Sequence, residues 1–110
     1  MAGDIATADL ITSLEYGVPV LGAKAITVLG HSSCGAVKAT IDAKAVPGHI
    51  STLYRSIRPA VDQTEPNLEA ATKLNAKIQA GLLRTSLFAE MIGKAQLKIV
   101  AAYYVLRPAP

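Results

Sequence analysis

The chain has 110 residues, of which 51% are hydrophobic and 17% are charged, a balance that favours a packed core over disorder. Its net charge of +3 is spread along the sequence without clusters of basic and aromatic residues, so we expect no nucleic-acid binding. The first residues lack the pattern of a signal peptide, no apolar stretch approaches the roughly 20 residues that span a bilayer, and the one cysteine cannot form an internal disulfide. We therefore expect one cytoplasmic domain over residues 1–110 that does not enter a membrane.

The first predicted element is a helix over Ala6–Leu21, where apolar residues recur at steps of three and four. Thr7 can cap its start, and Pro19 either kinks its last turn or ends it early. The β-branched run Ala25–Leu29 predicts a buried strand, and Ala36–Ile41 predicts a helix after a short turn. Strand, tight turn and helix in that order place the turn at the carboxyl edge of a parallel sheet, where ligands commonly bind.

That turn, Gly30–Gly35, holds the candidate site residues His31 and Cys34. Imidazole and thiolate are ligands that zinc prefers, and the two-residue gap allows both side chains to reach one ion. The start of the following helix also favours the thiolate form of Cys34. Zinc takes four ligands, however, so the motif alone leaves open a buried cysteine beside a turn histidine. Ser32 and Ser33 are expected to cap the helix.

The second half of the chain begins with a segment that is predicted to be rich in loops. Three prolines lie between residues 46 and 66, where we expect one short helix near Ser51–Ile57. The helical period then returns over Asn67–Ile92, with an expected break near Gly81 or after Ser86.

The last predicted element is the strand Leu97–Tyr104, in which Tyr103 and Tyr104 alternate between the core and the surface. A strand that follows the first one after a helical crossover pairs with it in parallel, through a right-handed connection. The predicted fold class is therefore α/β, with a small parallel sheet flanked by helices.

Four blocks of the sequence carry a resemblance to a known family: Ala2–Asp4, Ser13–Val18, Val28–Ala39 and Ile99–Tyr104. In order and spacing they are similar to the alanine-glycine-asparagine element, the serine-x-glutamate-tyrosine helix, the glycine-histidine-x-x-cysteine-glycine turn and the last strand of the β-class carbonic anhydrases. The resemblance implies that zinc is held by His31 and Cys34, and that the substrates are carbon dioxide and bicarbonate. The family's reaction, that of a carbonate dehydratase, uses a zinc-bound hydroxide that attacks carbon dioxide.

The resemblance also indicates what the chain lacks. The family holds zinc with two cysteines and one histidine, and its first cysteine belongs to a cysteine-x-aspartate-serine-arginine motif that precedes the alanine-glycine element. That motif does not occur in this sequence, and Asp4, which stands where the family often has asparagine, matches no ligand. We therefore expect a truncated β-carbonic anhydrase-like fragment with weak or no hydratase activity by itself, and we assign no catalytic residue.

Three further hypotheses are open at this stage. Two chains related by a twofold axis could each donate His31 and Cys34 to one zinc ion, and the loss of neighbouring strands favours such a homo-oligomer. The chain could instead be a catalytically silent module for self-association built on the same core. A weaker option is thiol or redox chemistry at Cys34.

Overall fold

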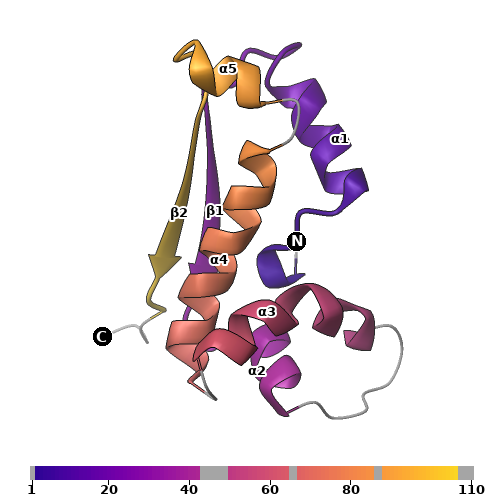
Figure 1. The fold of residues 1–110 in the computed structure, drawn as a ribbon, viewed down its shortest axis with the longest axis vertical. Coiled ribbons are helices and arrows are strands. Elements are labelled where there is room, and N and C mark those ends of the chain that lie inside the picture. The colour runs from indigo at the N-terminus through magenta and orange to yellow at the C-terminus, as the bar shows by residue number, and fades with distance from the viewer. Residues whose placement is uncertain (1, 43–49, 65–66, 86–87, 107–110) are drawn as a thin grey trace.

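The computed structural model of the chain describes residues 2–42, 50–64, 67–85 and 88–106, and Figure 1 shows the arrangement of its elements. In chain order they are the 3-10 turn η1 (Ala2–Asp4), helix α1 (Ala8–Gly17), strand β1 (Ala25–His31), helix α2 (Gly35–Asp42), the 3-10 turn η2 (Ile50–Leu53), helices α3 (Tyr54–Thr64), α4 (Leu68–Arg84) and α5 (Ala89–Gly93), and strand β2 (Lys98–Tyr104). The two strands separated by helices confirm the predicted α/β class.

Strands β1 and β2 pair in parallel, with His31 at the end of β1 opposite Tyr104, which confirms the predicted parallel pair. Helix α4 contacts both strands, and α1, α3 and α4 lie on the same side of the sheet (Figure 1). Along each strand, side chains alternate between the face that packs on α4 and the opposite face. Val28 and Ile99 are buried in one cluster with α4, whereas Leu29 is 48% exposed and Tyr104 is 57% exposed. In the described part of the chain, the face of the sheet opposite α4 is therefore open to solvent.

Helix α1 begins where the sequence predicts and ends earlier. The Thr7 hydroxyl accepts a 3.2 Å hydrogen bond from the amide of Leu10, so Thr7 is the N-cap. The last helical residue is Gly17 in place of the predicted Leu21. Pro19 follows closely and cannot donate to the helical ladder, and Leu21 is 70% exposed. Of the two predicted effects of Pro19, a kink or an early end, the structure shows the early end.

The segment from residue 50 to residue 64 is more helical than predicted. In place of one short helix at Ser51–Ile57, η2 leads directly into α3, which contains Pro59. A proline inside a helix removes one backbone hydrogen bond. The burial of an apolar face outweighs that loss, and this face consists of Ile57, Ala60 and Val61. Residues 46–49 and 65–66 of the predicted loop lie outside the described residues.

The long predicted helix is in fact two helices, α4 and α5. Asn67 caps the start of α4, where its side chain accepts a 2.9 Å hydrogen bond from the amide of Ala70. Gly81 is helical, and the break comes at Thr85, whose hydroxyl donates a 2.8 Å hydrogen bond to the carbonyl oxygen of Leu82. The predicted break near Gly81 is therefore wrong, and the predicted position after Ser86 lies outside the described residues.

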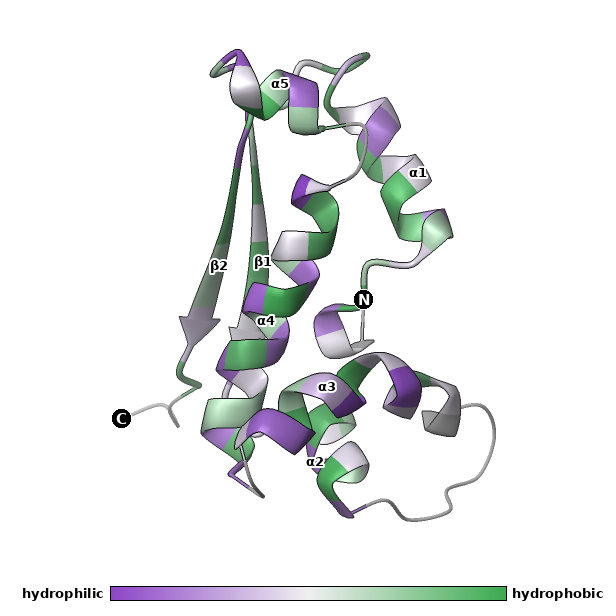
Figure 2. Ribbon diagram, in the orientation of Figure 1, coloured by the Kyte–Doolittle hydropathy of each residue, from purple (hydrophilic) through white to green (hydrophobic). Residues whose placement is uncertain are grey.

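Two buried clusters hold these elements together, and Figure 2 shows green apolar residues alternating with purple polar residues along the helices. The first cluster joins the sheet to α4 and α5 and includes Val28, Leu83, Phe88 and Ile99. The second joins η1, α2, α3 and α4 and includes Ile5, Cys34, Val37, Ile57, Val61 and Ala71. Cys34 is therefore a member of a hydrophobic cluster.

Candidate metal centre at the end of strand β1

His31 is the last residue of β1 and is half-buried at the carboxyl end of the sheet. The residue before it, Gly30, is buried, and a Cβ atom there would lie 3.1 Å from Cγ2 of Thr72 on α4. Since this spacing is tighter than ordinary van der Waals contact, only glycine lets the end of β1 approach α4 so closely. The close approach fixes the point at which His31 leaves the sheet.

The turn that follows brings Cys34 to the start of α2. Ser33 adopts a left-handed backbone conformation with a φ of 56°, which redirects the chain before the helix. Cys34 has a free thiol and is 6% exposed. The structure therefore places both predicted site residues, His31 and Cys34, in one strand-to-helix turn. The burial of Cys34 argues against the redox hypothesis, because reactive cysteines are partly exposed.

One ring nitrogen of His31 is engaged within this turn. Nδ1 lies 2.8 Å from the backbone carbonyl oxygen of Ser32. A carbonyl oxygen can only accept a hydrogen bond, so Nδ1 carries the proton and donates it. Nε2 therefore holds the lone pair that a metal ion needs.

Ser32 joins the same turn to the end of β2. Its amide donates a 2.9 Å hydrogen bond to the carbonyl oxygen of Tyr104, and its hydroxyl accepts a 2.7 Å hydrogen bond from the amide of Leu106. The hydroxyl that was expected to cap α2 thus accepts a hydrogen bond from Leu106, the second residue after β2. This correction follows from the register of the parallel pair, which brings Leu106 beside Ser32.

Asp4 is a carboxylate that the fold brings near His31. Burial raises the pKa of Asp4 above its ordinary value, and the charge of His31 acts in the opposite direction. The sequence predicts no role for Asp4. Its proximity to His31 is not visible there either, because helix α1 separates the two in the chain.

A buried polar pair on α4 holds the segment that carries Asp4. Asn75 donates a 2.6 Å hydrogen bond from Nδ2 to the carbonyl oxygen of Gly3. Gln79 accepts a 2.9 Å hydrogen bond from the amide of Ala6 at Oε1 and donates to Oδ1 of Asn75 at 3.3 Å. Both side chains are at most 2% exposed, so each of these bonds matters for stability.

Solved structures similar to this fold are β-carbonic anhydrases. The β-carbonic anhydrase CcaA superposes with a TM-score of 0.76 at 22% identity, over 94% of this chain and 60% of that chain. The wild-type β-carbonic anhydrase CafD of Aspergillus fumigatus gives a TM-score of 0.66 at 26% identity, over 92% of this chain and 63% of that chain. The family model described as carbonic anhydrase matches residues 1–109. The chain belongs to the β-carbonic anhydrase family.

Relatives by sequence carry the same name. A carbonic anhydrase of Mycolicibacterium smegmatis is 41% identical over 64 aligned positions, covering 54% of this chain and 31% of that protein. Carbonic anhydrase 2 of Mycobacterium tuberculosis is 28% identical over 120 aligned positions, covering 96% of this chain and 56% of that protein. A large part of each relative therefore has no counterpart in this β-carbonic anhydrase sequence. None of the described helices is long and apolar enough to cross a bilayer.

In this β-carbonic anhydrase chain, His31 and Cys34 fit zinc in chemical type, because imidazole and thiolate are two of its common ligands. Two ligands are half of the four that zinc usually takes. Among the residues that the structure describes, no group of three or more histidine, cysteine, aspartate or glutamate side chains is assembled to hold a metal ion.

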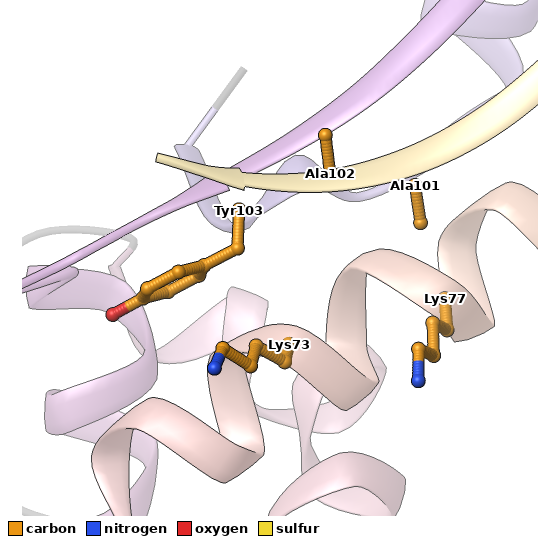
Figure 3. Close-up of a pocket in the computed structure, with 5 residues that line it drawn as sticks. All are labelled: Lys73, Lys77, Ala101, Ala102 and Tyr103. Atoms are coloured by element: carbon orange, nitrogen blue, oxygen red, sulfur yellow. The ribbon is translucent and has the colours of Figure 1, made fainter. Parts of the chain in front are cut away.

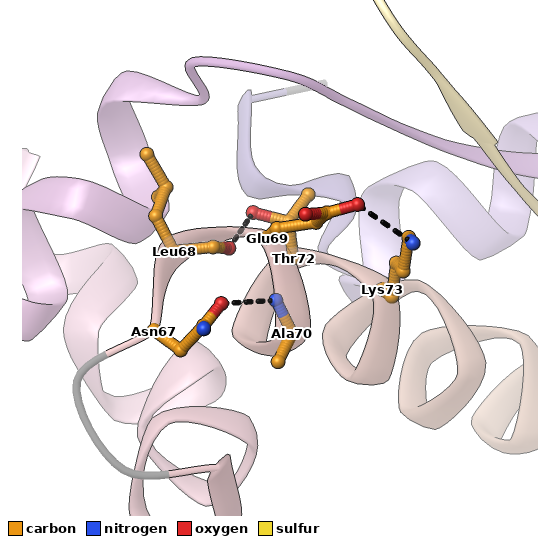
Figure 4. A network of polar contacts seen from close by, with 6 residues as sticks. All are labelled: Asn67, Leu68, Glu69, Ala70, Thr72 and Lys73. Atoms are coloured by element: carbon orange, nitrogen blue, oxygen red, sulfur yellow. Dashed lines mark hydrogen bonds and ion pairs between the residues drawn. The ribbon is translucent and has the colours of Figure 1, made fainter.

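A pocket of about 170 Å³ lies between α4 and β2 (Figure 3) and is lined by Lys73, Lys77, Ala101, Ala102 and Tyr103. Nζ of Lys73 lies 4.9 Å from the centroid of the Tyr103 ring and forms a 2.8 Å ion pair with Glu69 (Figure 4). Its charge is thus already engaged. Two features of the sequence indicate this pocket. The two lysines have i, i+4 spacing on one helix, and Tyr103 lies on the strand face that points toward the core.

Proposed function

We propose that this chain carries the histidine–cysteine half of a β-carbonic anhydrase zinc centre, with His31 binding through Nε2 and Cys34 through Sγ. The observation that carries the proposal is the 2.8 Å contact from Nδ1 of His31 to the carbonyl oxygen of Ser32, because in the neutral ring it leaves the lone pair on Nε2, at the carboxyl edge of the sheet. Family membership supports it. When bound, zinc supplies a water with its pKa lowered toward neutrality, for the hydration of carbon dioxide to bicarbonate.

The surroundings of Cys34 suit a ligand that binds in a closed site. Its side chain belongs to the apolar cluster of Ile5, Val37 and Ile57, so water has little access to it. A buried thiolate requires compensating charge. A metal ion and the amide groups at the start of α2 are the groups that would provide it.

Metal analysis of the purified protein tests this assignment. Wild type is compared with Cys34→Ala and His31→Ala, and with Ser33→Ala as a control in the same turn. We expect the first two variants to lose bound zinc and the control to keep it. With cobalt in place of zinc, a thiolate-to-metal absorption band is expected in wild type and not in Cys34→Ala. Equal metal content in all four proteins would contradict the proposal.

We further infer that the chain by itself hydrates carbon dioxide weakly or not at all. Two ligands hold zinc loosely, and the described residues assemble no third one. Stopped-flow measurement of hydration with added zinc checks this inference. A rate close to that of an intact family member would contradict it.

A homo-oligomer is one way to complete the ligand set. Two chains related by a twofold axis would together offer two histidines and two cysteines, a common tetrahedral zinc site. Native mass spectrometry decides this point. One zinc ion per two chains supports a shared site, and metal-free monomers exclude it.

The second candidate function is catalytically silent self-association. The open face of the sheet favours it, since Leu29, Tyr104 and Leu106 are 48%, 57% and 56% exposed and gathered apolar surface marks contact sites. We expect Leu29→Lys to weaken association in sedimentation experiments. Leu82→Lys, at a 50% exposed position on α4, is the matched control. Metal-free oligomers without hydratase activity would favour this function over the zinc centre.

The cytoplasmic location stays a prediction from the sequence.

A further inference from the structure

Ser32 occupies the first position beyond β1, where the hydrogen-bond ladder with β2 continues. In a parallel ladder, a residue donates its amide to one residue of the neighbouring strand and accepts, at its carbonyl oxygen, the amide two residues further along that strand. Ser32 follows the first half of this pattern, because its amide donates to the carbonyl oxygen of Tyr104 at 2.9 Å. The second half would join the amide of Leu106 to the carbonyl oxygen of Ser32.

The observed acceptor of the Leu106 amide is different. It is the side-chain hydroxyl of Ser32, at 2.7 Å. The carbonyl oxygen of Ser32 instead lies 2.8 Å from Nδ1 of His31. The Ser32 hydroxyl thus accepts the ladder hydrogen bond that the Ser32 carbonyl oxygen would otherwise accept. The carbonyl oxygen is therefore available to accept a hydrogen bond from the imidazole ring.

We propose that Ser32 is a positioning residue that sets the tautomer of His31. Without the hydroxyl, the Leu106 amide turns to the same carbonyl oxygen and competes with Nδ1 for it. Because a carbonyl oxygen has two lone pairs, both donors can share it, and the hydrogen bond from Nδ1 is weakened and not abolished. A fraction of the imidazole rings then carries the proton on Nε2 instead of Nδ1. Protonated Nε2 cannot bind a metal ion, so the hydroxyl affects metal affinity through His31. This consequence for the metal rests on the proposed function, whereas the tautomer does not.

The test is the ring ¹⁵N spectrum of His31 in the metal-free chain, at a pH where imidazole is neutral. The chain has two histidines, so a His49→Gln background leaves His31 as the one signal. We expect the proton on Nδ1 in this background. Adding Ser32→Ala should shift the ring signals toward the Nε2–H form. It should also speed hydrogen exchange of the Leu106 amide by up to about threefold, because that amide then shares its acceptor with Nδ1, which is a partial loss of one hydrogen bond.

Two further variants make the test specific. Ser32→Thr keeps a hydroxyl and should restore both the tautomer and the protection of Leu106. Ser33→Ala removes the neighbouring hydroxyl of the same turn and should change neither. The proposal is overturned by identical ring spectra with and without Ser32→Ala, or by a shift that Ser32→Thr fails to restore. If Ser32→Ala does not fold, a proton on Nε2 in the parent protein still overturns it.

Cobalt binding separates this inference from the proposed function. Changes in groups that orient metal ligands weaken metal binding by about tenfold or more, and we expect a loss of that size in Ser32→Ala. A parent protein without any thiolate-to-cobalt band refutes the proposed zinc centre, while the tautomer measurement still decides the role of Ser32.

Discussion

The side-chain amide of Asn75, in the middle of α4, lies 2.6 Å from the carbonyl oxygen of Gly3, in the first turn of the chain. Gln79, one helical turn further along, extends the contact to the amide of Ala6. Buried polar groups of this kind stabilise a fold only while their partners are in place. The contact therefore holds η1, and with it Asp4, against α4 and beside the end of β1.

Asn75→Ala is expected to lower the free energy of unfolding by about 1–3 kcal/mol, because it leaves a buried carbonyl oxygen unpaired. Urea denaturation followed by circular dichroism measures the change. Lys77→Ala, at an exposed position of the same helix, should stay within about 0.5 kcal/mol of wild type. Equal midpoints for the two variants would show that the contact with Gly3 does not stabilise the fold.

Gly30→Ala is expected to destabilise the protein by about 1–3 kcal/mol, as overpacking does, since the added methyl group would meet Cγ2 of Thr72 at 3.1 Å. Thr72→Ser removes that methyl group and keeps the hydroxyl, which donates to the carbonyl oxygen of Leu68 at 2.8 Å (Figure 4). The double variant should therefore recover part of the loss. Thermal unfolding of the four proteins gives the coupling energy, and strict additivity would disprove the contact.

Gly81→Ala is expected to stabilise the protein, in contrast to Gly30→Ala. Gly81 lies inside α4, and a Cβ atom there would meet nothing within 4 Å. Alanine costs less backbone entropy in a helix than glycine, so the gain should be about 0.5–1 kcal/mol. Guanidinium denaturation measures it. A loss of stability would mean that the space beside Gly81 is occupied in the folded protein.

Asp4→Asn is expected to stabilise the protein near neutral pH and to have little effect in acid. Burial raises the pKa of Asp4, so the folded state binds its proton more tightly than the unfolded state. The resulting stability is fully present below the unfolded aspartate pKa of about 3.9 and is lost as the pH rises through the higher pKa of the folded state. Asparagine cannot ionise, and it tolerates the left-handed φ of 55° at this position.

Thermal unfolding midpoints at several pH values between acid and neutral check this prediction. The difference between Asp4→Asn and wild type should widen as the pH rises. Asp62→Asn, at an exposed position on α3, is the control for a general effect of removing one negative charge. A difference that is constant across the range would contradict the assigned cause.

The elements around the candidate site could be predicted because each has a local signal. The β-branched run before Gly30 predicts β1, and the need for a helical crossover predicts parallel pairing with β2. Helix α3 could not be predicted in full. Pro59 is a local signal for a loop, and it is overridden by the packing of Ile57 against η1 and α2, which depends on distant segments.

The candidate site shows the same division. The motif places His31 and Cys34 in one turn, because their spacing is short and follows a strand. The contacts that set the chemistry of the turn were not predicted. The packing of η1 brings Asp4 near enough for His31 to affect its pKa, and the register of the sheet brings Leu106 beside Ser32. Both depend on tertiary structure and leave no trace in local sequence.

The register of the two strands has a consequence for how the protein folds. Residue Ala25 pairs with Lys98, so the sheet closes a loop that contains most of the chain. Pairings between residues far apart in the sequence form slowly, because the chain loses the entropy of loop closure before the contacts stabilise it. We expect the helical layer of α3 and α4 to assemble first and the strands to join it late. The turn of His31 and Cys34 then reaches its final shape in the last folding step, so these two side chains come together only after the helical layer has formed.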